Sequence, residues 1–365
     1  MSNGKYLSIL EEIKNKGGKL DSEEPNDKVL IIDGLNTFIR CFSAIPTLND
    51  DGAHVGGVVG FLRSIGYAIR TIRPTRTIIV FDGKGGSNRR KKIFPEYKAG
   101  RNMSKRLNRS YDFNTKEDEH QSMVMQLTRV IDYLDYLPIT TITIENIEAD
   151  DTMAYVTKQI LKTSNITLMS TDKDFLQLVN HRVSVWSPTK KKMYDPPKVL
   201  EDYGIPSHNF AVYRAIDGDK SDNIDGVRGW GLKTIQKKLP LLLEDNILNI
   251  GDIIKEDEKL KECEELLKRN YTLMQLDEVD ISSSAKTKIL DKIREPINRL
   301  NKIQFQKRFI EDRLFATLPN MDSWLVQCFA KLNQMAEKTH GKKTLIQYRI
   351  RKKGSTKKVV YGILS

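Results

Sequence analysis

Short apolar runs that end in acidic residues recur along the first half of the chain, and they constrain its fold most. Stretches with helical character separate these runs. Apolar runs of this length, alternating with helices, are typical of buried parallel strands in an α/β sheet. The strands predicted in this way are 29–32, 77–81, 139–144, 166–169 and, as a fifth candidate, 182–186.

Acidic residues gather where these strands end and again in segment 217–225. Any one strand-terminal aspartate is more often a helix cap than a ligand. Four acidic ends together predict a cluster, because parallel strands place their carboxyl ends at one edge of the sheet. Carboxylates without His or Cys favour hard cations such as Mg²⁺ or Mn²⁺, and two ions about 4 Å apart can activate water against a phosphodiester. The acids concerned are Asp33, Asp82, Glu148, Asp150, Asp151, Asp172, Asp174, Asp217, Asp219, Asp222 and Asp225.

Positive charge is concentrated in two segments. The chain of 365 residues has a net charge of +12, but segment 84–109 carries ten Lys/Arg against one acid, and segment 338–365 carries nine against none. Each segment is therefore +9, which leaves −6 for the rest of the chain. A single basic run is usually solvated surface, whereas two such runs beside carboxylate clusters favour a polyanionic partner such as nucleic acid.

The composition excludes several other classes of protein. Cys41, Cys263 and Cys328 are odd in number and far apart, which predicts free thiols in a reducing, cytoplasmic compartment. No apolar run of about 18 residues is present, so no membrane contact is expected. Segment 217–228 lacks the glycine and the final glutamate of an EF-hand loop, and segment 226–234 lacks the Gly-Lys pair of a nucleotide-binding loop.

The second half of the chain is predicted to be mainly helical. Stretches 239–254, 260–273 and 289–315 have the Ile/Leu content of packed helices. Alternation in 344–350, followed by a turn-like segment and a β-prone run, predicts a basic hairpin near the C-terminus. At the other end, residues 6–13 are predicted to form an amphipathic helix.

Segment 226–234 contains three closely spaced glycines followed by Lys233 and Thr234. Such a turn lets backbone N–H groups approach a phosphate, although an ordinary packing joint between helices has the same pattern. In the basic segment, Phe94, Tyr97 and Tyr111 interleave with cations, which suits stacking on unpaired bases and contact with phosphates.

Six motifs in order resemble those of the 5′-nuclease superfamily, which includes flap endonucleases, the exonuclease domain of bacterial DNA polymerase I, and phage ribonuclease H-type nucleases. They are I-I-D-G-L-N, V-F-D-G, F-P-E-Y-K-A-G-R, I-E-A-D-D, S-T-D-K-D-F-L-Q-L and G-D-K-S-D-N-I-D-G-V-R-G-W-G-L-K-T, within about 28–240. The stand-alone form and long C-terminal region are more similar to the phage enzymes, so a phage origin is expected.

The resemblance implies a PIN-like (Rossmann-like), mostly parallel α/β sheet with a helical arch over its site. The implied divisions are an N-terminal extension (1–27), a catalytic domain (28–206) with the arch at about 84–120, a helical DNA-binding region (207–335) with a helix–three-turn–helix at about 212–240, and a basic tail (336–365).

The resemblance also assigns roles by motif position. A first metal ion would be surrounded by Asp33, Asp82, Glu148 and Asp150, and a second by Asp151, Asp172, Asp174, Asp219 and Asp222. Catalytic roles in the arch would fall to Tyr97, Lys98 and Arg101. The turn residues Gly226, Gly229, Gly231, Lys233 and Thr234 would contact DNA, and relatives also hold a monovalent ion such as K⁺ there. Further DNA contacts are expected from the basic segment, at Arg89, Arg90, Lys91 and Lys92.

The leading hypothesis is a Mg²⁺-dependent 5′→3′ exonuclease and flap endonuclease, with Mn²⁺ as a substitute. It would act as a monomer in the cytoplasm, or in the host cytoplasm if viral, on branched or nicked DNA and on RNA–DNA primers during replication or repair. A single-strand-binding protein or a sliding clamp is the expected protein partner. Two alternatives stay open: a structure-specific DNA-binding scaffold with little catalysis, and a PIN-type nuclease for single-stranded RNA.

Overall fold

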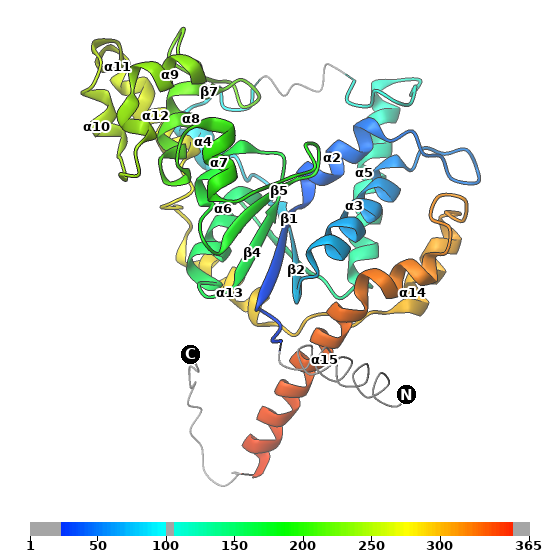
Figure 1. The fold of residues 1–365 in the computed structure, drawn as a ribbon. Helices are drawn as coiled ribbons and strands as arrows, with labels where there is room; N and C mark the ends of the chain where they lie inside the picture. Colours follow the sequence, from blue (N-terminus) through cyan, green and yellow to red (C-terminus); the bar gives the residue numbers. More distant parts are fainter. Residues whose placement is uncertain (1–22, 100–105, 353–365) are drawn as a thin grey trace, which may run out of the picture.

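The computed structural model describes residues 23–99 and 106–352, with side chains as far as Gly341. Its centre is a six-stranded sheet in the order β3-β2-β1-β4-β5-β6 (Figure 1). Neighbouring strands are parallel except for β5 and β6. The strands are β1 (Lys28–Asp33), β2 (Arg76–Asp82), β3 (Thr140–Ile144), β4 (Asn165–Met169), β5 (Val183–Ser187) and β6 (Lys192–Tyr194). The predicted sheet is confirmed, and β6 is an additional antiparallel edge strand.

Side chains of the central strand alternate between two hydrophobic cores. Val29 and Ile31 belong to one core, whereas Leu30 and Ile32 belong to the other. This alternation follows from the two-residue period of a strand, and all four side chains are fully buried because helices cover both faces. The continuous apolar run from which β1 was predicted is therefore a consequence of a two-sided core.

One face is covered by helices from both ends of the chain (Figure 1). The N-terminal helices of this layer follow β1 directly, and the last two return to the same face after the whole opposite layer has been built. These helices are α2 (Gly34–Ala44), α3 (Gly56–Ile72), α5 (Lys116–Asp135), α14 (Lys302–Glu311) and α15 (Met321–Lys352).

The other core continues from the sheet into most of the helices between residues 149 and 294. It therefore includes residues on both sides of position 206, where the sequence predicts a domain boundary. The helices of this layer are α6 (Ala149–Tyr155, continued by a π-helical turn, Val156–Ile160), α7 (Pro196–Tyr203), α8 (Phe210–Asp217), α9 (Leu232–Lys238), α10 (Ile250–Ile254), α11 (Glu258–Glu262), α12 (Glu264–Met274) and α13 (Ser283–Arg294).

The strand order places a topological switch point between β1 and β4. From β1 the chain builds β2 and β3 on one side, and later β4, β5 and β6 on the other. In open α/β sheets, ligands bind beyond the carboxyl ends of the strands at such a point. A short helix in the predicted arch, α4 (Asn88–Ile93), follows β2 at this end of the sheet (Figure 1).

The hairpin predicted near the C-terminus needs correction, and the predicted packed helices are shorter than their apolar stretches. Residues 344–350 lie in α15 and not in a hairpin, because this helix starts at Met321 and adding residues to an existing helix is favourable. Stretch 289–315 is broken between α13 and α14, where Pro296 cannot continue a helix. Stretches 239–254 and 260–273 are also divided into shorter helices. The amphipathic helix predicted for 6–13 lies outside the described residues.

The thiols agree with the sequence analysis. Cys41 and Cys328 are buried, Cys263 is half-buried, and all three are free. Among the helices of the described residues, none combines the length and the apolar character that a bilayer-spanning segment needs.

Candidate active site

Three aspartates at strand ends are held by backbone hydrogen bonds. Asp33 caps α2 by accepting from the backbone N–H of Asn36 over 3.0 Å. Asp82 accepts from the backbone N–H of Ala149 over 2.7 Å, which ties the end of β2 to the start of α6. Asp172 caps the 3₁₀ helix Lys173–Leu178 in the same way. These aspartates therefore act as turn and helix caps, and the same contacts fix their direction at the switch point.

Burial, with repulsion from neighbouring carboxylates, raises the pKa of Asp33, Asp150 and Asp172. Burial raises the pKa of Asp33 to about 7, and repulsion from Asp82 and Asp172 adds to the shift. Burial likewise raises the pKa of Asp172 to about 7, with repulsion from Asp174. Burial also raises the pKa of Asp150 well above its usual range, and repulsion from Asp172 and Asp33 adds to the shift. Repulsion between these carboxylates makes their fully ionised form unfavourable without a cation.

Arg214 of α8 joins two further predicted ligands. Its guanidinium, 4% exposed, lies 2.6 Å from the carboxylate of Asp174 and 2.6 Å from that of Asp219, and it donates to the carbonyl of Gly218 over 2.8 Å. Burial raises the pKa of Asp174 despite Arg214. Burial opposes ionisation of Asp219, but hydrogen bonds from Ser221 and the charge of Arg214 outweigh it and lower the pKa. Arg214 therefore fixes these two carboxylates relative to each other.

Glu148, at the start of α6, is 2% exposed and surrounded by cations. Arg90 pairs with one carboxylate oxygen, and Nζ of Lys98 lies 2.5 Å from the other. The hydroxyl of Tyr97 lies 3.3 Å from Glu148. Burial would raise the pKa of Glu148, but Arg90 and Lys98 outweigh it and lower the pKa. Glu148 is therefore an ionised carboxylate held at the base of the predicted arch.

Tyr97 joins the arch segment to the acidic turn. Its hydroxyl donates to Asp222 over 3.1 Å, and the backbone N–H of Lys98 donates to the Asp222 carbonyl over 2.8 Å. The Tyr97 ring is 2% exposed, so it cannot stack on a base in this conformation. The structure therefore gives Tyr97 a positioning contact with Glu148 and Asp222, in place of the stacking that the sequence suggests.

Asp151 and Arg90 differ from their sequence predictions. Asp151 is 2% exposed and pairs with Arg90 over 2.8 Å and with Arg89 over 3.2 Å. Arg90 is 3% exposed and also donates to the carbonyl of Leu273 over 2.8 Å. In place of a DNA contact, Arg90 makes a buried structural contact between the arch segment, α6 and α12. In this conformation both carboxylate oxygens of Asp151 are paired with the two arginines.

The remaining predicted cations are at the surface. Lys91 and Lys92 are exposed, and with Arg89 they line a shallow hollow of about 740 Å³ at the base of the arch. Arg101 lies outside the described residues.

The predicted glycine turn lies between α8 and α9, after a small antiparallel pair, β7 (Gly218–Asp219) and β8 (Ile224–Asp225). A Cβ on Gly226 would collide with the carbonyl oxygen of Asp217, so packing alone requires this glycine. A Cβ on Gly229 or Gly231 would meet nothing within 4 Å. Gly229 has a φ of 83°, which favours glycine, whereas for Gly231 no internal contact requires one. Lys233 is exposed beside them and Thr234 is half-buried.

Comparisons with known proteins identify relatives of this chain. A family model described as "5′-3′ exonuclease, N-terminal resolvase-like domain" matches residues 28–204. The 5′-3′ exonuclease of Buchnera aphidicola subsp. Acyrthosiphon pisum is 30% identical over 238 residues, which are 65% of this chain and 76% of that exonuclease. The chain belongs to the 5′-nuclease superfamily. The resemblance inferred from the six motifs is thereby confirmed.

Longer members of the superfamily match over only part of their length. The thermostable DNA polymerase I of Thermus filiformis is 33% identical over 249 residues, which are 67% of this chain and 27% of the polymerase. This chain thus spans about a quarter of the length of that polymerase.

The fold matches solved structures of the superfamily. The T5 D15 protein co-crystallised with metal ions has a TM-score of 0.55 and 24% identity, covering 78% of this chain and 98% of that protein. A complex of the bacteriophage T5 D15 flap endonuclease with DNA and metal ions has a TM-score of 0.57 and 24% identity, covering 80% and 100%. At this identity the comparison establishes the fold, which is the predicted PIN-like architecture.

The cluster supplies the right donors for a metal, but not a closed site. Among the described side chains, no three His, Cys, Asp or Glu residues are grouped closely enough to hold an ion. Cations of the protein itself lie among the carboxylates: Arg214 beside Asp174, and Arg90 and Lys98 beside Glu148. The donors fit a hard divalent cation by chemistry, because they are carboxylate oxygens whose mutual repulsion a cation would relieve.

Sequence reasoning missed two residues that organise the cluster. Ser170 donates to Asp33 over 3.1 Å and accepts from the backbone N–H of Asp172 over 3.1 Å, so it links two strand ends. Arg214 could have been predicted from the sequence. It is the one cation of the apolar helix α8, and an arginine that is buried is expected to pair with acids. Ser170 could not have been predicted in this way, since a serine after a strand is common.

Proposed function

We propose that this chain is a divalent-metal-dependent 5′ nuclease, which hydrolyses DNA phosphodiesters near 5′ ends as an exonuclease and as a flap endonuclease. The observation that carries the proposal is the convergence of buried strand-end carboxylates. Burial raises the pKa of Asp33 and of Asp150, and repulsion from Asp172 adds to both shifts. Membership of a superfamily whose relatives are named 5′-3′ exonucleases supports the same reaction. Residues 28–206 would form the catalytic domain and 207–335 most of the DNA-binding region.

Two or more Mg²⁺ ions, with Mn²⁺ as a substitute, suit the cluster because both ions prefer oxygen ligands. When bound, such ions supply activation of water and stabilisation of the leaving oxygen of a phosphodiester. The residues that would hold the ions are Asp33, Asp82, Glu148 and Asp150 for the first, and Asp172, Asp174, Asp219, Asp222 and, if it leaves its arginines, Asp151 for the second.

Lys98 would act directly on the scissile phosphate. Burial opposes its charge, but Glu148 and Asp150 outweigh burial and raise the pKa of Lys98, so it is protonated at neutral pH. A fixed cation beside the carboxylate cluster stabilises the negative charge that develops on the phosphate. Arg101 follows in the same motif and would act with Lys98. Tyr97 would keep Lys98 and Glu148 in place.

DNA would be held on both sides of this cluster. Lys91 and Lys92 offer exposed charge at the base of the arch, and Lys233 offers it beside the glycine turn. Open space above Gly231 would let a phosphate approach the backbone, and K⁺ is the candidate monovalent ion there. The substrates would be nicked or branched duplexes with 5′ ends, including RNA–DNA primers, during replication or repair, with a single-strand-binding protein or a sliding clamp as partner to a monomeric enzyme.

The test is a panel of 5′-labelled substrates incubated with Mg²⁺ or with EDTA. The panel contains a 5′ flap, a nicked duplex, an RNA-primed duplex and single-stranded RNA. We expect metal-dependent release from the flap and from the nicked and primed duplexes, with product lengths that separate exonuclease from flap cutting. Tight binding in EDTA with no turnover in Mg²⁺ would instead favour the DNA-binding scaffold. Preference for RNA without a duplex would favour a PIN-type ribonuclease.

A further inference from the structure

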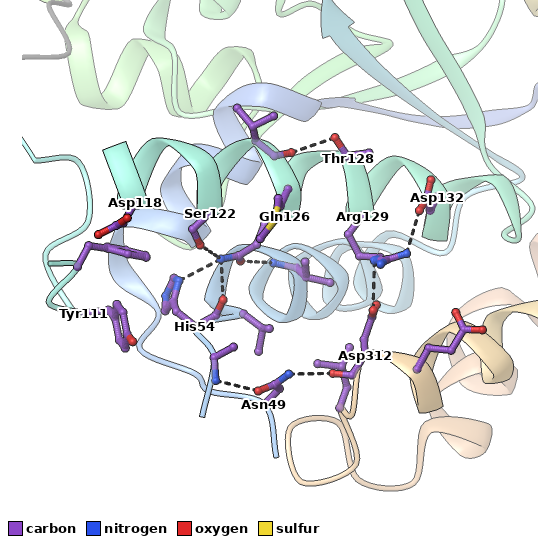
Figure 2. A pocket seen from close by; sticks show the side chains of 18 of the residues that line it. Asn49, His54, Tyr111, Asp118, Ser122, Gln126, Thr128, Arg129, Asp132 and Asp312 are labelled. Atoms are coloured by element: carbon purple, nitrogen blue, oxygen red, sulfur yellow. Dashed lines mark hydrogen bonds and ion pairs between the residues drawn. The ribbon is translucent and has the colours of Figure 1, made fainter. Parts of the chain in front are cut away.

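A second cleft, of about 750 Å³, lies between α5, the α2–α3 connection and the end of α14 (Figure 2). Its walls come from three distant parts of the chain, 49–58, 111–132 and 311–314. None of the candidate active-site residues lines it. Evidence for its function therefore has to come from the residues that line it.

Hydrogen bonds within the protein fix the shape of this cleft. The side-chain oxygen of Gln126 accepts from the backbone N–H of Gly57 over 2.8 Å, so a residue of α5 caps α3, whose own cap residue Val55 has no side-chain acceptor. The Gln126 amide nitrogen donates to the carbonyl of His54 over 2.8 Å and to Ser122 over 3.0 Å (Figure 2). These wall groups already have partners, so the cleft is preformed and is poorly suited to a small polar substrate.

Apolar side chains are exposed along one side of the cleft. Val124 and Met125 of α5 are 47% and 69% exposed, and both belong to its lining. Tyr111 stacks on His54, with ring centroids 5.0 Å apart, and Leu314, which is 1% exposed, also belongs to the lining. Exposed apolar surface next to a preformed cleft is typical of protein association, and methionine adapts to different partners.

The charges of the cleft are mainly negative. Its lining contains five carboxylates and one guanidinium, Arg129, which lies 3.1 Å from Asp132 and 3.2 Å from Asp312. Arg106 and Arg308 pair with lining carboxylates from outside, which makes five acids against three bases, a net charge of −2. The net charge of the lining is negative, in contrast to the basic segment 84–109, and disfavours a phosphate backbone. The five carboxylates are those of Asp112, Asp118, Asp132, Glu311 and Asp312.

We propose that this cleft docks a basic segment of a partner protein, in which lysines or arginines flank an aliphatic or aromatic anchor. The anchor would lie against Met125, Tyr111 and Leu314, and the flanking cations would face the carboxylates at the two ends of the cleft. Charge complementarity of this kind fixes the orientation of a partner and raises its association rate. None of the lining residues belongs to the strand-end carboxylates, so the proposal stands whether or not these carboxylates are catalytic.

The test uses the full chain and a labelled eight-residue probe peptide, with five lysines around leucine, isoleucine and phenylalanine. We expect saturable binding by fluorescence anisotropy that weakens as salt is raised. The double variant Asp112→Lys, Glu311→Lys should weaken it roughly tenfold, and Met125→Ser should weaken it several-fold, since both charge and anchor contribute. Asp291→Lys, at an exposed position of α13, is the control and should bind like the wild type.

Three results would overturn the proposal. The first is binding that the cleft variants leave unchanged and that Mg²⁺ abolishes, which would place the peptide on the catalytic carboxylates. The second is failure of the peptide to bind, together with tighter duplex-DNA binding by the double variant, which would assign the face to nucleic acid. The third is self-association of the full chain that the double variant loses, which would assign the cleft to a second copy. Equal binding of a peptide with serines in place of its apolar residues would also remove the anchor from the proposal.

Discussion

The Nζ of Lys98 lies 2.5 Å from Oε1 of Glu148, in an ion pair that is almost closed to solvent. The backbone of Lys98 is left-handed, with a φ of 60°, and its N–H donates to the carbonyl of Asp222. One residue thus connects the arch segment, the start of α6 and the acidic turn after α8. A substrate phosphate that takes over this lysine would free one oxygen of Glu148, while Arg90 would still hold the other.

Replacing Lys98 by methionine should separate catalysis from binding. The variant keeps an alkyl chain over the Tyr97 ring, which the Lys98 ammonium now approaches to 4.9 Å, but it removes the charge. We expect the single-turnover rate on a 5′ flap to fall about 10²- to 10³-fold, with DNA affinity within a few-fold of wild type. Lys92→Met, on an exposed lysine of the same segment, is the control and should mainly weaken binding. Wild-type turnover by Lys98→Met would exclude a direct role in the reaction.

Asp82→Asn should abolish cleavage and leave DNA binding measurable. An asparagine oxygen can still accept from the backbone N–H of Ala149, so the joint between β2 and α6 should survive. Loss of one carboxylate weakens the hold on a divalent cation, and we expect turnover to fall about a thousandfold or more. Flap cleavage and anisotropy on the same protein, with circular dichroism to verify folding, measure the three quantities. Retained cleavage would remove Asp82 from the catalytic centre.

The sequence predicts the strands well because they depend on local patterns, and it shows acidic residues directly after them. The apolar run before Asp33 marks β1, and the same pattern marks β2 before Asp82. Parallel topology then brings the ends together without further information. The edge strand β6 has only three residues and a charged first position, so no local pattern distinguishes it.

Contacts between residues that are distant in the sequence could not be predicted. Arg90 reads as one cation of a basic run, yet its guanidinium is buried against Leu273, which is 183 positions away. Gln126 reads as a polar residue on the surface of α5, yet it caps α3 across 69 positions. In both cases tertiary packing determines whether the side chain contacts solvent or another part of the protein. The local sequence does not indicate which of the two occurs.

Stability without metal should fall as pH rises from about 4 to about 7. Asp33 and Asp172 have pKa values raised to about 7 in the folded protein, from a usual value of 3.8, so the folded state binds more protons than the unfolded state over this range. Stability is therefore lost as pH rises through the folded pKa. Asp33→Asn removes one of these carboxylates and keeps its cap geometry. In EDTA at pH 8 it should exceed wild type by on the order of 2–4 kcal/mol, with a much smaller difference near pH 4.

Thermal unfolding in EDTA and in Mg²⁺ measures this effect. Mg²⁺ should raise the Tm of wild type at pH 8 more than that of Asp33→Asn, because an ion that binds only the folded state stabilises it by mass action. A wild-type Tm in EDTA that rises steadily from pH 4 to pH 8 would contradict the raised pKa values.

Arg90→Met should destabilise the fold. Its guanidinium bridges the buried carboxylates of Glu148 and Asp151, and removing it leaves both without their main cation. Breaking a buried pair from one side costs about 3–5 kcal/mol. Arg89→Met is the matched control, because Arg89 is more exposed and leaves the Arg90 contacts intact, and it should cost about 1 kcal/mol or less. Urea unfolding in EDTA measures both. An unchanged urea midpoint for Arg90→Met, with weaker DNA binding, would restore the sequence prediction of a DNA contact.

Two glycines of the turn after α8 should respond oppositely to alanine. Gly226→Ala would drive a Cβ into the carbonyl oxygen of Asp217, so we expect a loss of about 2 kcal/mol or more in the free energy of unfolding. Gly231→Ala adds a methyl group to open space, so stability should stay within about 1 kcal/mol of wild type. If a DNA phosphate approaches the backbone there, Gly231→Ala should still weaken duplex binding severalfold. It should do so with an unchanged salt slope, since no charge is removed, whereas Lys233→Ala should reduce the slope by about one. Unaltered affinity in Gly231→Ala would mean that this turn is a packing joint and that the grip on DNA lies elsewhere.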